Sequence, residues 1–227
     1  MEDKYNRYYA HCIIDVSKSM IEEENSYGKF LWARKFNDYK NVLDVGCGRS
    51  WFVRARPQNC VGLDSNPIIV NHYQNEGLNI IQGFAYELPF TDNHFDAIFC
   101  NYLLEHLSQP EKSLEEFYRV LKPNGYLYIS VPSSYMLTKG FFDDWTHIKP
   151  YSKIGIKMLA EMIGFVRIQT RYDICKLAHA NEQHYGGLFA TTRIHRYFGW
   201  KAWYSYLRLV EIFGPKNRNM IILEAWK

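Results

Sequence analysis

The chain has 227 residues, 47% of them hydrophobic and 17% aromatic, which is enough for one sizeable core, and we expect a single domain. Lysine and arginine total 27 against 24 acidic residues, and the net charge of +3 is too small to imply a nucleic-acid partner on its own. No apolar stretch approaches the roughly 20 residues that cross a bilayer. The charged N-terminus is unlike a signal peptide, so we expect no export.

Five cysteines stand at positions 12, 47, 60, 100 and 175, an odd number with wide spacing. This pattern is typical of reduced thiols, and we expect a cytoplasmic protein. No Cys-x-x-Cys pair is present to hold zinc.

Short β-rich apolar runs alternate with longer helix-compatible stretches, a pattern typical of βα units around a mostly parallel sheet. Residues 1–40 predict a mainly helical lead-in. The predicted strands span residues 41–45, 59–63, 79–82, 95–101, 125–131, 165–173 and 219–226. Seven strands are enough for a complete sheet of an α/β fold.

Three predicted helices between these strands have recognisable ends. They span residues 67–75, 110–121 and 152–163. Asn66 is an N-cap in front of Pro67, and Gly164 ends the third helix. We therefore divide the single predicted domain, 1–227, into four parts. These parts are the lead-in (1–40), a core (41–173), an insertion (174–218) and a last strand (219–227).

A buried strand runs into a glycine turn at residues 41–48. Gly46 and Gly48 permit positive φ angles and let a ligand approach the backbone. A second apolar strand ends in Asp64, 20 residues after Asp44, where a carboxylate can accept both hydroxyls of a ribose. The pair of features indicates a nucleotide-type site. A nicotinamide site is disfavoured because Trp51 occupies the third glycine position of Gly-x-Gly-x-x-Gly.

Five blocks in this order resemble the class I S-adenosylmethionine-dependent methyltransferases, in the ubiquinone/menaquinone or type 11 branch. The blocks are VLDVGCG (42–48), VGLDSNP (61–67), GFAYELPFTDNHFDAIFC (83–100), NYLLEHL (101–107) and LKPNGYLYISVP (121–132). The resemblance implies a Rossmann-like sheet with helices on both faces and an antiparallel last strand. It also implies S-adenosylmethionine as cofactor and S-adenosylhomocysteine as product.

The same resemblance assigns the methionine portion of the cofactor to the glycine turn. Asp44 with Gly46, Cys47 and Gly48 would hold that portion, and Asp64 would hold the ribose. A cationic sulfonium and an ammonium favour carbonyls and carboxylates as neighbours, which agrees with this assignment.

The remaining cofactor contacts are implied at three further places. Ser65 or Asn66 would flank the adenine, and Phe84 with Ala85 would border its ring. Asn101, at the end of the fourth strand, would bound the sulfonium end.

Three positions depart from the family pattern. Ser50 stands where many members have a third glycine, and Pro57 interrupts a short stretch that we expect to hold an abbreviated first helix. Phe84 replaces an aspartate that often bonds the adenine amine, although its ring can still stack on adenine. These departures keep a catalytically inactive relative of the family open as an alternative.

Candidate catalytic residues follow the fourth and fifth strands. Glu105 and His106 come after the fourth strand, and His106 either packs or caps a helix or acts in catalysis. Asp144 and His147 lie in the segment 141–151, which resembles the variable acceptor loop of the family. Their spacing allows a base with its orienting partner, a simple loop-closing hydrogen bond, or half of a metal site. The sequence places no further ligands, so we expect no metal.

The insertion 174–218 carries much of the aromatic content, and its helical stripes are apolar on much of their circumference. Packing within the domain, a lid over the acceptor, a homodimer contact and a weakly supported membrane-surface contact all remain open. Residues 101–104 lack the signature of base-amino methyltransferases.

The function predicted from these features is S-adenosylmethionine-dependent O- or C-methylation. We expect the acceptor to be a small molecule, a glycan or a lipid-linked compound, and not a nucleic acid. The rival hypothesis is a methyltransferase-fold protein that binds a ligand or partner without catalysis.

Overall fold

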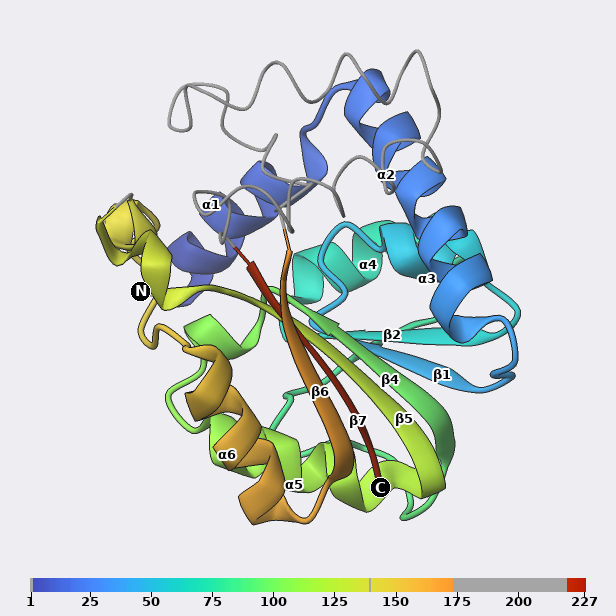
Figure 1. Cartoon of the computed structure of the whole chain (residues 1–227). Helices are drawn as coiled ribbons and strands as arrows, with labels where there is room; N and C mark the ends of the chain where they lie inside the picture. The colour runs from blue at the N-terminus through green and yellow to red at the C-terminus, as the bar shows by residue number, and fades with distance from the viewer. Residues whose placement is uncertain (1, 139, 174–219) are drawn as a thin grey trace.

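A computed structural model describes residues 2–138, 140–173 and 220–227 of the chain (Figure 1). The predicted helical insertion at 174–218 lies outside the described residues. The division of the chain into one domain with four parts therefore stays a prediction.

Seven strands form one sheet in the order β3-β2-β1-β4-β5-β7-β6. The pairs from β3 through β5 are parallel, whereas β7 is antiparallel to both β5 and β6. The strands are β1 (Val42–Val45), β2 (Cys60–Asp64), β3 (Ile80–Gln82), β4 (Phe95–Asn101), β5 (Leu121–Pro132), β6 (Val166–Asp173) and β7 (Met220–Trp226). The predicted fold class is confirmed, including the antiparallel last strand. Only β5 differs appreciably, because it begins directly after the preceding helix and not at residue 125.

The helices are α1 (Glu2–Ile14), α2 (Lys18–Leu31), α3 (Trp51–Ala55), α4 (Pro67–Asn75), α5 (Pro110–Val120) and α6 (Lys153–Ile163). Short turns are the π-helical η1 (Trp32–Phe36) and the 3-10 helices η2 (Leu104–His106), η3 (Ser134–Thr138) and η4 (Phe141–Asp143). Asn66 caps α4 by accepting from the backbone N–H groups of Ile68 and Ile69, and Gly164 ends α6 in the left-handed conformation, as predicted. In the part of the chain that the structure describes, no helix is long and apolar enough to cross a membrane.

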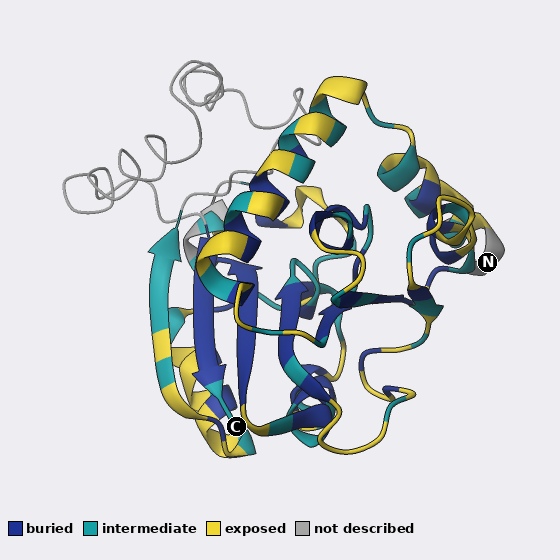
Figure 2. Ribbon diagram, turned by 90° about the vertical axis from the view of Figure 1, so that its right-hand side faces the viewer, coloured by how far each residue is buried: buried dark blue, intermediate teal, exposed yellow. Residues whose placement is uncertain are grey.

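The helices cover the two faces of the sheet in separate groups (Figure 1). On one face α5 and α6 bury Leu114, Phe117 and Ile156 against alternate residues of the central strands. On the other face the lead-in packs with α3 and α4. The central strands β1, β4 and β7 are almost wholly buried, whereas the edge strand β6 is intermediate or exposed, as are the outer helix surfaces (Figure 2). The sheet therefore presents its functional groups only at its edges and ends.

Aromatic rings bind the lead-in to the sheet. Phe52 of α3 stacks on Phe99 of β4 with ring centroids 3.9 Å apart, and Trp32 stacks on Phe52 at 5.0 Å. Phe36 meets Phe52 edge-on at 4.9 Å. Such pairs add to the free energy gained from burial of their area. Part of the high aromatic content thus forms a core under η1, a use that the sequence patterns did not indicate.

An ion cluster around Glu224 of β7 joins four elements. Its buried carboxylate accepts hydrogen bonds from Lys35 Nζ (2.7 Å), from Tyr126 Oη (2.7 Å) and from the guanidinium of Arg171. Burial alone would raise the pKa of Glu224, but the hydrogen bond from Lys35 and the charge of Arg171 outweigh it and leave the pKa below its ordinary value. The cluster therefore fixes η1 to the strands β5, β6 and β7.

We predict that Glu224→Gln lowers the free energy of unfolding by about 3 kcal/mol, because it leaves two cations beside a neutral group in a buried place. Urea unfolding at pH 7 measures this change. The matched control is Glu111→Gln, which breaks the exposed pair with Lys149 and should change the free energy by less than about 1 kcal/mol. Because the pKa of Glu224 is lowered, its contribution is present above the ordinary value of 4.5 and is lost as the pH falls through the folded-state value. Equal effects of the two substitutions would contradict the role assigned to Glu224.

Candidate functional site

The central strands β1 and β4 are parallel neighbours whose following helices lie on opposite faces of the sheet. After β1 the chain continues through α3 on one face, and after β4 it continues through α5 on the other face. A crevice for ligands forms outside the carboxyl ends of the strands at such a reversal. In the register of the sheet, Val45 of β1 lies opposite Leu63 and Cys100. The predicted residues Asp44, Asp64 and Asn101 are thus brought to one edge.

The glycine turn after β1 is held by hydrogen bonds to β2. The N–H groups of Gly46 and Cys47 donate to the carbonyl of Leu63 at 2.8 and 3.0 Å. Gly46 has a φ of 72°, and a Cβ there would lie 3.0 Å from the side chain of Leu103. The position therefore requires glycine both for its backbone conformation and for its packing.

Asp64 ties this turn to the start of α4. Its Oδ2 accepts from the N–H of Gly48 at 3.0 Å and its Oδ1 from the N–H of Asn66 at 2.9 Å. Burial raises the pKa of Asp64, and these backbone hydrogen bonds only partly oppose the rise. A carboxylate offers about four acceptor positions, so Asp64 retains capacity for hydroxyl donors.

Asp44 is buried with an unsatisfied oxygen. Its side chain is 2% exposed, and its Oδ1 has no hydrogen-bond partner among the residues that the structure describes. Burial, together with the charge of Asp64, raises the pKa of Asp44 well above its usual range. An unpaired carboxylate in such a place is costly, and a cationic ligand group would compensate for it.

The lead-in braces the turn from outside. Glu24 of α2, which is 2% exposed, pairs with Arg49 in the turn at 2.7 Å between Oε1 and Nε. Trp51 packs against Tyr27 of α2 with ring centroids 5.4 Å apart. The side chain of Trp51 is thus covered by α2. The abbreviated first helix that we expected is α3, which has five residues.

The remaining predicted cofactor residues flank this region. Ser65 is exposed, and Ala85 is buried in the core. Phe84 is 47% exposed and stacks on Tyr86 at 5.4 Å. The Asn101 Oδ1 accepts a hydrogen bond from the hydroxyl of Ser130. An exposed aromatic face beside the carboxyl end of β2 suits stacking on a flat ring.

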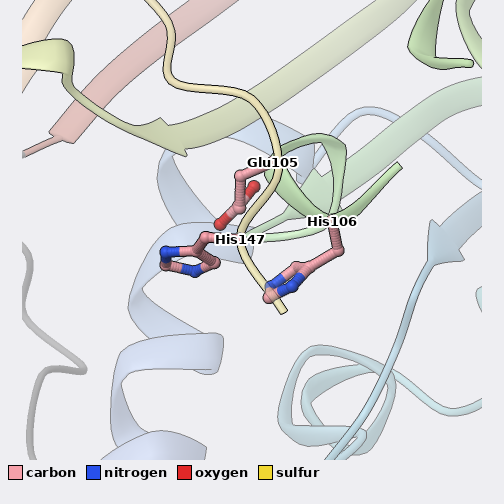
Figure 3. A group of neighbouring side chains, drawn as sticks. All are labelled: Glu105, His106 and His147. Carbon is pink, nitrogen blue, oxygen red and sulfur yellow. The ribbon is translucent and has the colours of Figure 1, made fainter. Parts of the chain in front are cut away.

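A second cluster unites η2 with the segment that follows η4. The N–H groups of Ile148 and Lys149 donate to the backbone carbonyl of Glu105 at 2.8 and 3.1 Å. This pairing brings His147 within 4.7 Å of His106 between ring centroids, and both lie close to the Glu105 side chain (Figure 3).

Asp144 reaches His106 through Thr146. The Asp144 Oδ1 accepts from the backbone N–H of Thr146 at 3.0 Å and from its hydroxyl at 2.6 Å, and the Thr146 Oγ1 lies 2.8 Å from His106 Nδ1. Asp144 Oδ2 lies 3.8 Å from His147 Nε2, which is longer than a hydrogen bond. His147 Nδ1 instead lies 2.7 Å from the carbonyl of Phe141. The residues at the predicted spacing therefore lie together, but Thr146 is the link that the spacing did not indicate.

Burial governs the protonation of this cluster. Burial, with a smaller contribution from the charge of Asp144, raises the pKa of Glu105 to about 8. Burial and the neighbouring His147 lower the pKa of His106 to about 4. Burial alone would raise the pKa of Asp144, but the Thr146 hydrogen bonds and the two imidazoles bring it below its ordinary value. His106 is thus a neutral imidazole at pH 7.

The thiol of Cys100 is influenced by charges of both clusters. Burial raises the pKa of its thiol well above the usual range, and the charges of Glu105 and Asp44 add to the rise. Its side chain therefore lies within electrostatic reach of both the glycine turn and the histidine cluster. The candidate site thus has an acidic part at the glycine turn and an imidazole part at η2, and Cys100 is influenced by the charges of both.

The sequence of residues 43–129 matches the family model described as a methyltransferase domain. Over most of the chain, the fold is that of a solved S-adenosylmethionine-dependent methyltransferase from Archaeoglobus fulgidus. The TM-score is 0.63 at 20% identity, and the match covers 93% of this chain and 100% of that one. The chain belongs to the class I S-adenosylmethionine-dependent methyltransferases. This membership confirms the resemblance seen in the five sequence blocks.

Two curated relatives have named activities. A fatty-acid O-methyltransferase of Mycolicibacterium smegmatis is 40% identical over 97 residues, which cover 38% of this chain and 35% of that protein. A demethylmenaquinone methyltransferase of Bacteroides fragilis is 29% identical over 149 residues, which cover 59% of this chain and 58% of that protein. The chain spans less than half the length of the first curated relatives that it matches. The activity of the whole protein is therefore a matter of proposal.

The turn holds one non-glycine residue, Ser50, in the left-handed region, with a φ of 54° and no solvent exposure. We predict that Ser50→Gly leaves the free energy of unfolding unchanged or raises it by about 1 kcal/mol, because glycine adopts this conformation without strain. Ser50→Val should lower it by at least about 1 kcal/mol. Chemical denaturation measures both changes. Ser50→Ala removes the hydroxyl without altering the strain, and a Gly variant less stable than the Ala variant would contradict the prediction.

Proposed function

We propose that this chain transfers a methyl group from S-adenosylmethionine to a small-molecule, glycan or lipid-type acceptor by O- or C-methylation. The observation that carries the proposal is the buried, unsatisfied carboxylate of Asp44 beside a glycine turn that Asp64 holds in place. The cofactor of this family has a cationic ammonium and a cationic sulfonium, and both need negative or carbonyl neighbours. The residues present therefore fit the cofactor.

Each cofactor portion has an assigned set of residues in this proposal. Asp44 and the turn from Gly46 through Cys47 to Gly48 hold the methionine portion, and Asp64 accepts from the ribose hydroxyls. Ser65, Phe84 and Ala85 border the adenine, and Asn101 bounds the sulfonium end. When bound, the cofactor supplies the electrophilic methyl group.

The protein's own part in the reaction is orientation and proton transfer. Methyl transfer is an in-line displacement, so the acceptor atom must be held opposite the leaving sulfur. A hydroxyl acceptor also has to lose its proton to a base. We assign this base to His106, whose burial keeps it neutral and whose Nδ1 is fixed through Thr146 and Asp144. The ring of His147 packs beside that of His106, with centroids 4.7 Å apart.

An apolar acceptor is supported by the surface around His147. Phe142, Trp145 and Ile148 are exposed large hydrophobic residues of the same segment, with exposed fractions of 58, 70 and 57%. Exposed apolar side chains clustered beside a polar site are typical of ligand-binding surfaces. The named relatives act, by their names, on a fatty acid and on demethylmenaquinone, which are both largely apolar.

The second candidate function is a binding protein of methyltransferase fold without catalysis. Phe84 favours it, because a phenyl ring offers no hydrogen bond to the adenine amine. A homodimer contact or a membrane-surface contact through residues 174–218 stays a prediction, since that segment lies outside the described residues.

We expect S-adenosylhomocysteine to bind the wild-type chain, with Asp64→Asn raising the Kd about 10- to 50-fold through weakened charged hydrogen bonds to the ribose. Isothermal calorimetry measures this change. Asp38→Asn, at an exposed position, is the matched control and should leave the Kd unaltered. Thermal unfolding checks that the Asp64 variant is folded, because Asp64 also holds Gly48. No binding at millimolar ligand would exclude the enzyme and favour the second candidate.

We also expect His106→Ala and Asp144→Ala each to lower kcat by at least about 10-fold while the Kd for S-adenosylhomocysteine stays within twofold. His147→Ala tests whether the third residue acts in the same step. The assay follows labelled methyl transfer from S-adenosylmethionine to a panel of fatty acids, quinols and glycans. Unchanged turnover in a variant removes that residue from the mechanism.

A further inference from the structure

The three side chains Glu105, His106 and His147 form a group with the composition of a metal site. One carboxylate oxygen and one ring nitrogen from each histidine all lie within 4.8 Å of one another. The group joins η2 to the segment after η4, which are about 40 residues apart in the sequence, so packing alone assembles it (Figure 3). Ligand atoms around a tetrahedral ion with bonds of about 2.1 Å lie roughly 3.4 Å apart, so small side-chain rotations would close the site.

The Glu105 carboxylate points independently to a cation. The residue has no solvent exposure, and neither carboxylate oxygen has a hydrogen-bond partner within the described ranges. The charge of Asp144 acts on it with the same sign and gives no compensation. A buried carboxylate of this kind is expected to pair with a charge or to coordinate a metal.

The hydrogen bonds of the two histidines leave a ligand nitrogen on each ring. The Thr146 hydroxyl donates to Asp144, so it must accept from His106 Nδ1. The carbonyl of Phe141 can only accept, so His147 Nδ1 carries its proton as well. Each imidazole therefore keeps the lone pair on Nε2. Metal-binding histidines are commonly oriented in this way, through a second ring nitrogen that donates to a carbonyl or to a carboxylate network.

We propose that Glu105, His106 and His147 bind one divalent transition-metal ion, with Zn²⁺ the ion that best suits the set. Two imidazoles and one carboxylate are a ligand set of zinc sites that keep an open fourth position. Mg²⁺ and Ca²⁺ prefer oxygen ligands, so a set with two imidazole nitrogens suits neither ion. Of the half site suggested by the spacing of Asp144 and His147, only His147 belongs to this set. The fold adds Glu105 and His106 from another segment. The proposal concerns binding alone, and it describes a state in which His106 Nε2 is held by the ion and does not serve as a base.

The test is calorimetric titration of chelator-treated full-length protein with Zn²⁺, in a Cys12→Ser, Cys175→Ser background. The two substitutions take away the exposed thiol of Cys12 and the one cysteine outside the described residues. We expect one equivalent to bind with a Kd of 1 μM or below, and Mg²⁺ to bind at least about 100-fold more weakly. Glu105→Gln and His147→Ala should each weaken zinc binding at least about 100-fold. Thr146→Val should weaken it about 10-fold or more, because it frees the His106 ring.

The matched control is His72→Ala, which removes a half-exposed histidine that pairs with Glu76, and it should leave zinc binding unchanged. Zn²⁺ should also raise the thermal unfolding midpoint of the background protein and leave that of Glu105→Gln unaltered. Equal zinc affinity in the background, Glu105→Gln and His147→Ala would overturn the proposal, and so would a Kd above about 100 μM. Loss of S-adenosylhomocysteine binding with zinc binding intact would refute the proposed function alone.

Discussion

The parallel pairing of β1 with β4 is the constraint on which the site depends. Parallel neighbours end at the same edge of a sheet, so Asp44, Asp64 and Glu105 come together from separate parts of the sequence. Burial raises the proton affinity of all three carboxylates, and the charge of Asp64 adds to the rise at Asp44. Backbone N–H groups partly offset this cost for Asp64, whereas Asp44 and Glu105 keep unsatisfied oxygens. The edge is therefore prepared for ligands that carry positive charge.

The aromatic packing of the lead-in explains how such a costly edge is kept in place. Phe52 and Phe99 stack across α3 and β4, and the Glu224 cluster fixes η1 to the far strands. Glu24 then reaches from α2 to Arg49 in the glycine turn. The free energy of folding that these contacts contribute offsets the unfavourable burial of the carboxylates at the site, as is usual for functional sites.

Local signals account for most of what the sequence predicted. Asn66, Pro67 and Gly164 favour helix ends through their own local chemistry. The helices that begin or end at these residues lie where we expected them. The glycine turn and Asp64 were predictable for the same reason, since both follow strands with clear apolar patterns. Thr146 was not predictable, because its role arises only when Glu105 pairs with the backbone of residues 148 and 149. Contacts between distant segments leave no periodic pattern in a single sequence.

Cys100, at the carboxyl end of β4, is influenced by the charges of both halves of the candidate site. Its thiol is fully buried, and its proton affinity responds to Asp44 on one side and to Glu105 on the other. A cation bound at either carboxylate would therefore lower the proton affinity of the Cys100 thiol. Occupation of the glycine turn and occupation of the histidine cluster should thus both act on this thiol, because each cation would compensate one of the two carboxylates that raise its pKa. The unsatisfied oxygens belong to two different residues, Asp44 and Glu105, so a ligand that compensates one carboxylate would leave the other uncompensated.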